Sequence, residues 1–91
     1  MAELIHPDGT VTEHRPGNPP DWTLAELQFL VGGFLEQARP PGWLPRGETV
    51  LAFCDEDGLS KGLAANATAS RLLGRQYVGP VLIIADEERV A

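Results

Sequence analysis

The sequence predicts an α+β fold with one mixed, mainly antiparallel sheet of four or five strands and two helices, in the order ββαβββαβ. Three observations predict it. The chain opens with two β-prone runs around a turn signal, a complete helix-start signal follows, and two short continuous apolar runs lie at 49–54 and 81–85. Ninety-one residues suit a single domain spanning 1–91, because a chain of this length builds one small core.

The first predicted element is a β-hairpin. Residues 2–6 and 10–15 are β-prone, and the Pro-Asp-Gly segment 7–9 between them is a turn signal. Aspartate bonds locally to the backbone and glycine tolerates φ > 0, which a tight turn requires. A three-residue loop sets Ile5 opposite Val11 as an apolar cross-strand pair.

The first helix has both a start and a stop signal. Thr23 and Glu26 form a capping box, in which each side chain satisfies a backbone N–H at the position of the other. Trp22 and Leu27 flank this cap and predict a hydrophobic staple. Apolar residues then recur at helical spacing until the glycine pair 32–33, which ends the helix.

The second helix, over 67–73, is predicted from Asn66 as its N-cap and Gly74 as its stop. The remaining strands are predicted from apolar or β-prone runs, at 34–39, 49–54, 59–63 and 80–85. We expect both helices on one face of the sheet, with the two apolar runs as its central strands.

Loops rich in proline separate these elements at 16–20 and 40–45, because proline removes backbone donors. Trp43, in the second loop, is expected to fold back as a lid on the core. The polar tail 86–91 is expected to fray.

Charge and composition exclude several classes of protein. Thirteen acidic residues against seven basic ones give a net charge of −6 with no basic cluster. Direct nucleic-acid binding is therefore not expected, whereas a negative surface suits a basic protein partner. The apolar run 81–85 is too short for a membrane span, and the first residues do not resemble a signal peptide. A single cysteine cannot form an internal disulfide, so we expect a cytoplasmic protein.

Two apparent metal motifs fail on spacing. Asp55 and Asp57 precede Gly58 as in a calcium loop, but such a loop places its glycine at the sixth position rather than the fourth. His6 and His14 are the only imidazoles, and the hairpin separates them along its ribbon. A zinc site needs three or four convergent ligands, so no metal site is predicted.

No catalytic or cofactor-binding residue is predicted, and no cofactor is expected. Cys54 ends an apolar strand and precedes the acids 55–57, whose charges raise a thiol pKa and disfavour the thiolate. Ser60 and Ser70 lack the strand–turn–helix context of a nucleophile elbow. The glycine pair 32–33 follows a helix, whereas a dinucleotide fingerprint needs glycines before one.

One modest cationic patch is a candidate anion or ligand site. If the second helix packs near 59–63, the basic side chains meet the helix N-terminus there. The residues of this patch are Lys61, Asn66, Arg71 and Arg75. Scattered surface charges are the alternative interpretation.

The order of these segments resembles a known family, the domain of unknown function 3846. The stretches that carry the resemblance are Ile5–Gly9, Leu24–Glu36, the acidic turn before Gly58, Lys61–Leu63, Asn66, Ala69, Leu72 and Gly79–Ile84. The loops 16–20 and 40–45 look like features of this chain alone. The resemblance implies a compact domain of the kind found in phages, plasmids and bacterial genomes. It implies no catalytic residue and no established activity.

Two function classes remain open. The first is a non-enzymatic protein-binding module, an accessory or regulatory factor of phage or mobile-element type. Its contacts would be acidic, at Asp55, Glu56 and Asp57, together with Glu3, Glu13 and Glu36. The alternative is a domain that binds a small molecule, nucleotide or anion beside Lys61, Asn66 and Arg71. Self-association through exposed aromatic residues, Phe29 and Trp43, is a further hypothesis.

Overall fold

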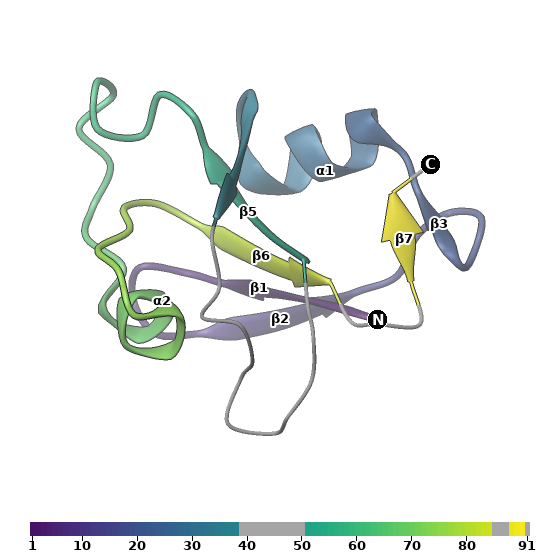
Figure 1. Ribbon diagram of the computed structural model, residues 1–91, viewed down its shortest axis with the longest axis horizontal. Coiled ribbons are helices and arrows are strands. Elements are labelled where there is room, and N and C mark those ends of the chain that lie inside the picture. Colours follow the sequence, from purple (N-terminus) through teal and green to yellow (C-terminus); the bar gives the residue numbers. More distant parts are fainter. Residues whose placement is uncertain (39–50, 85–87, 91) are drawn as a thin grey trace.

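The computed structural model describes residues 1–38, 51–84 and 88–90. Its strands are β1 (Ala2–Ile5), β2 (Val11–His14), β3 (Asp21–Trp22), β4 (Leu35–Ala38), β5 (Leu51–Asp55), β6 (Val81–Ile84) and β7 (Arg89–Val90), and its helices are α1 (Leu24–Val31) and α2 (Ala67–Leu73). Five strands form one sheet in the order β2-β1-β6-β5-β4, and β3 pairs with β7 beside it (Figure 1). The predicted α+β class is confirmed.

All pairings within the five-stranded sheet are antiparallel, and the parallel pairing is confined to β3 and β7. The opening hairpin forms as predicted, with Ile5 opposite Val11. Gly9 has φ +92°, and Asp8 Oδ1 accepts the Thr10 backbone N–H at 2.9 Å. Within the described residues, no helix is long and apolar enough to cross a membrane.

Helix α1 begins and ends where the sequence predicts. The Thr23 Oγ1 atom accepts from the Glu26 backbone N–H at 3.2 Å, and Glu26 Oε1 accepts from the Thr23 N–H at 2.9 Å. Gly32 caps the C-terminus in the left-handed conformation. Trp22 and Leu27 are both buried in the core that α1 covers, as the predicted staple requires.

The two helices lie on opposite faces of the sheet, so the expectation that both share one face was wrong. Leu27 of α1 packs in one core with Leu82 of β6, whereas Leu73 of α2 packs in another with Val81. Residues that alternate along a strand point to opposite faces. All of β6 is buried, so each of its faces needs its own cover. The continuous apolar run was the signal for this arrangement.

Asn66 joins three parts of the fold and is fully buried. Its Oδ1 atom accepts the Ala69 backbone N–H at 3.0 Å, which is the predicted N-cap of α2. Its Nδ2 atom donates to the Ile5 carbonyl and the Gly79 carbonyl, each at 2.9 Å. One side chain therefore ties α2 to the end of β1 and to the approach to β6, and all its hydrogen-bonding groups are satisfied.

Two further expectations were wrong. No strand forms at 59–63, where successive turns bond Lys61 N–H to Asp57 O and Leu63 N–H to Gly58 O. The tail does not fray throughout, since Arg89–Val90 forms β7. Trp43 and the loop 40–45 lie outside the described residues.

The tail is held by Glu88, which precedes β7. Its carboxylate accepts from Trp22 Nε1–H at 2.9 Å and lies 2.7 Å from the amino group of Met1. Burial acts to raise the pKa of Glu88, but these two donors prevail and hold it below its ordinary value. A charged carboxylate thus connects the N-terminus, the buried Trp22 and the C-terminal segment.

Replacing Asn66 with alanine is expected to lower the free energy of unfolding by about 2–4 kcal/mol, because it removes a helix cap and two donors to buried carbonyls. Urea denaturation monitored by tryptophan fluorescence measures the change. Asn18→Ala is the matched control, since Asn18 is exposed and exposed substitutions change stability by about 0.5 kcal/mol or less. An Asn66→Ala protein as stable as the control would contradict the structural role.

Candidate functional site

The predicted cationic patch is not assembled as one site. The Asn66 side chain is fully bonded within the core, and the Lys61 amine lies 2.6 Å from Asp55 Oδ2. Arg71 is exposed on the last turn of α2. Arg75 lines a cavity beside the β4–β5 edge of the sheet, which the other three residues of the patch do not line. The prediction grouped residues by their nearness in sequence, but tertiary contacts occupy two of them.

Asp55 and Lys61 form an ion pair against the end of α1. The Asp55 side chain is 1% exposed and that of Lys61 is 42% exposed. The Lys61 amine also donates to the Gly32 carbonyl at 3.4 Å, so it places a cation at the helix C-terminus. A Cβ atom at Gly33 would lie 2.7 Å from Asp55 Oδ2 and 2.8 Å from Lys61 Nζ. The second glycine of the pair therefore makes room for the ion pair.

Asp55 was predicted as a contact for a protein partner, and that prediction was wrong because the carboxylate is buried. Hydrogen bonds from Lys61 and from the Asp57 backbone N–H hold the pKa of Asp55 below its ordinary value. The Asp57 N–H bond, 2.8 Å long, closes the acidic turn. Glu56 and Asp57 are exposed and stay available to a partner.

Lys61→Met is expected to lower the free energy of unfolding at pH 7 by about 1–2 kcal/mol, less than for a fully buried pair because Lys61 is partly solvated. The folded-state pKa of Asp55 is depressed, so the pair stabilises the protein above the unfolded pKa of about 3.9 and is lost as pH falls through the folded value. Urea denaturation over a pH series measures the difference between the two proteins.

That difference should be full at pH 7 and should shrink once the pH falls below about 4. Arg71→Met serves as the control, because it removes an exposed cation from α2. A difference that stays constant into strong acid would show that Lys61 does not act through Asp55.

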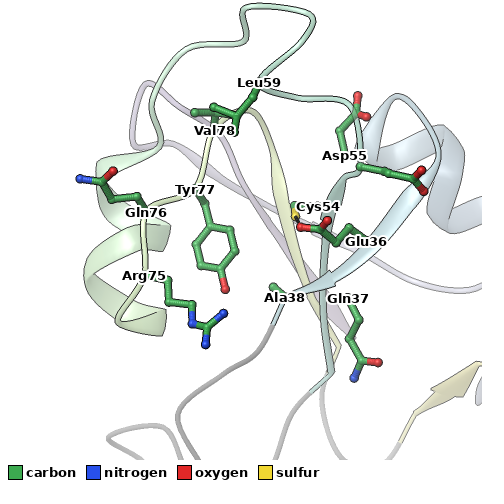
Figure 2. A pocket seen from close by; sticks show the side chains of 11 residues that line it. Glu36, Gln37, Ala38, Cys54, Asp55, Leu59, Arg75, Gln76, Tyr77 and Val78 are labelled. Carbon is green, nitrogen blue, oxygen red and sulfur yellow. Dashed lines mark hydrogen bonds between the residues drawn. The ribbon is translucent and has the colours of Figure 1, made fainter.

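A cavity of about 810 Å³ lies between the β4–β5 edge of the sheet and the segment 75–78 that leads from α2 toward β6 (Figure 2). Its inner surface is formed by buried Ala38 and Cys54. Figure 2 shows the Tyr77 ring reaching in from the 75–78 segment, with Arg75 at its hydroxyl end and Glu36 on the strand side. This is a binding-sized hollow, and its position relative to the sheet edge was not predicted.

The sequence offered only partial signals for this cavity. Arg75 belongs to the predicted patch and Glu36 to the predicted acidic contacts, whereas no motif in the sequence singles out Tyr77. Their meeting depends on how the 75–78 segment passes the sheet edge. No periodic pattern within either segment carries that information.

Cys54 faces this cavity as a protonated thiol. Burial is the main cause that raises its pKa, to about 11, and the nearby charges of Glu36 and Asp55 add to it. Its sulfur lies 3.9 Å from Glu36 Oε2. The thiol is therefore almost entirely protonated near neutral pH, as its acidic neighbours predicted.

Cys54 is expected to react slowly with the thiol reagent DTNB at pH 8 in the folded protein, because only roughly one thiol in a thousand is ionised at a pKa near 11. The same protein in denaturing urea provides the control, and there the label should be incorporated rapidly and stoichiometrically. Folded protein that reacts as fast as free cysteine would contradict both the burial and the raised pKa.

The two histidines lie closer together than the sequence suggested. His6 Nε2 and His14 Nε2 lie 3.1 Å and 2.8 Å from the Thr12 hydroxyl, which bridges them. Cys54 belongs to the core on the other face of the sheet and does not join them. Across the residues that the structure describes, no group of three or more His, Cys, Asp or Glu side chains is arranged to hold a metal ion.

A second hollow, of about 340 Å³, lies over α1 on the opposite face from the cavity. We call it the α1 groove, and it is lined by His14, Arg15, Trp22, Ala25, Glu26, Phe29 and Leu30. Phe29 is 85% exposed, and its helical position points away from the buried Leu27 and Val31. This aromatic ring therefore stands in solvent beside the groove, as the sequence predicted for Phe29.

The comparisons with known proteins identify the family of this chain. The family model described as Domain of unknown function (DUF3846) matches residues 4–90. The chain belongs to this family. The match covers both the α1 groove and the cavity, and it confirms the resemblance inferred from the segment order. No curated protein and no solved structure matches the chain.

Proposed function

We propose that this member of the DUF3846 family is a non-enzymatic protein-binding module that contacts its partner through the α1 groove. The observation that carries the proposal is Phe29, 85% exposed on the solvent side of α1. A large aromatic side chain gains little stability there, because it buries almost none of its surface on folding. Burial against a partner would supply that gain, and aromatic residues are enriched at such contacts.

The groove beside Phe29 suits an apolar side chain of the partner. Ala25 and Leu30 supply apolar surface within it, and Arg15 and Glu26 supply polar atoms. Glu26 is already bonded to the Thr23 and Gly17 backbone N–H groups, so its position is held before a partner arrives. Such a pre-formed hollow with a polar margin is typical of interface hot spots.

Charge favours a basic partner. The net charge of −6 would draw a basic protein toward this chain and speed its association. Glu56 and Asp57 are exposed acids outside the α1 groove, and they add to the negative charge that would attract such a partner. The accessory or regulatory role of phage or mobile-element type rests on the family resemblance and belongs to the same proposal.

Phe29→Gln is expected to weaken partner binding roughly thirtyfold, the effect of about 2 kcal/mol at a hot spot. Quantitative pull-downs from the host with the wild-type chain and the variant identify the partner, and titration with the purified partner gives the dissociation constant. The free energy of unfolding of the variant should lie within about 0.5 kcal/mol of that of the wild type, because Phe29 is exposed.

Leu59→Gln is the matched control, since Leu59 is 83% exposed and lines the cavity rather than the α1 groove. It should leave partner binding unchanged. Sedimentation of the purified chain tests whether the partner is a second copy. The proposal fails if every protein captured by the wild type is retained equally by Phe29→Gln.

A further inference from the structure

The cavity beside β4 carries opposite charges on its two walls. Arg75 lies on the 75–78 segment, while Glu36 and Glu56 lie on the side of the sheet edge. Asp55 also lines the cavity, but Lys61 neutralises it in an ion pair. Among the described lining residues, the remaining charges are two carboxylates and one guanidinium, which sum to −1.

The wall that carries Arg75 is held in place from both sides. The Tyr77 backbone N–H donates to Ser70 Oγ at 2.9 Å, and the Tyr77 carbonyl accepts from the Asn66 N–H at 2.9 Å. The neighbouring Val78 forms a bridge with Ala65. Both backbone groups of Tyr77 are thus occupied and its ring packs against the core, so the hydroxyl is the part that can meet a ligand in the cavity.

Arg75 itself has no bonded partner among the residues that the structure describes. Its guanidinium is the donor set that best matches a carboxylate, because two parallel N–H groups can bind both oxygens. Tyr77 lines the same cavity, and its hydroxyl offers another donor (Figure 2). This end of the cavity therefore suits an anionic group.

The opposite side suits a cation. Among the described residues, Glu36 has one weak contact, with the Cys54 thiol, whose sulfur lies 3.9 Å away, so its carboxylate keeps most of its capacity to accept. Glu56 is exposed and adds a second carboxylate. Ala38, Leu59 and Val78 supply apolar surface in the same cavity, which suits the aliphatic part of a ligand.

We propose that this cavity binds a free basic α-amino acid, such as arginine or lysine. The ligand carboxylate would meet Arg75 and the Tyr77 hydroxyl, and its two cationic groups would meet Glu36 and Glu56. Its methylene stem would lie along the apolar surface. The ligand carries a net charge of +1 and the lining carries −1, so each charge has a counterpart. This site is separate from the α1 groove and does not depend on it.

The same charges argue against other ligands. A nucleotide would bring several negative charges against Glu36 and Glu56, and Arg75 is the one cation among the described lining residues to offset them. A simple polyamine or metal cation would leave Arg75 facing positive charge. We therefore expect a ligand that carries both a carboxylate and cationic groups, bound around Arg75. It takes the place of the anion that was expected beside Lys61, Asn66 and Arg71.

Isothermal titration of the full chain tests the proposal with L-arginine and L-lysine. Agmatine lacks the carboxylate of arginine, and citrulline replaces its guanidinium with a neutral group, so each removes one charge. Saturable binding is expected for arginine and lysine, and weaker binding by roughly tenfold or more is expected for both analogues, the size of one lost charge-assisted hydrogen bond.

Variants at the two walls separate this site from general charge attraction. Arg75→Gln should weaken arginine binding by roughly tenfold or more while leaving the affinity for agmatine within about twofold. Glu36→Gln should weaken both arginine and agmatine. Arg71→Gln removes an exposed cation outside the cavity and should change neither.

Circular dichroism and urea denaturation confirm that these variants are folded. The proposal is overturned if neither arginine nor lysine gives a saturable signal at ligand concentrations up to about 10 mM, beyond the millimolar range that a weak site requires. It is also overturned if Arg75→Gln and Glu36→Gln bind arginine as tightly as the wild type.

Discussion

The burial of β6 on both faces is the constraint on which the rest of this structure depends. Val81, Leu82, Ile83 and Ile84 are each 4% exposed or less, and alternate residues belong to different cores. A strand of this kind cannot lie at the surface, because each face would expose apolar side chains to water. The chain therefore sends α1 to one face and α2 to the other, with β1 and β5 at the two edges of β6.

The short length of α2 explains why a cavity exists on its side. A seven-residue helix extends only about 10 Å along its axis, so it covers part of the sheet. Leu72 and Tyr77 add to the cover over the central strands. Toward the β4 edge no further helix follows among the described residues, and the space between that edge and the 75–78 segment stays open. This face of the sheet is therefore only partly covered, and the uncovered part forms one wall of the cavity.

Buried polar groups hold this thin architecture together at three places. Asn66 connects α2 with β1 and β6, Asp55 holds Lys61 at the end of α1, and Glu88 joins Trp22 to the N-terminus. In each case the buried group is satisfied, which avoids the cost of an unpaired donor or acceptor. The two hollows, the α1 groove and the cavity lined by Arg75, lie on opposite faces of the sheet that these links hold together.

The sequence by itself determined the elements whose signals are local. The Thr23–Glu26 box, the glycine stop of α1 and the cap at Asn66 all bond residues within a few positions, so short motifs predicted them. Only the tertiary structure decided which face each helix covers, that Asp55 is buried against Lys61, and that Arg75, Tyr77 and Glu36 share a cavity. These outcomes depend on contacts between segments far apart in the chain, and no local pattern records which of those segments will meet.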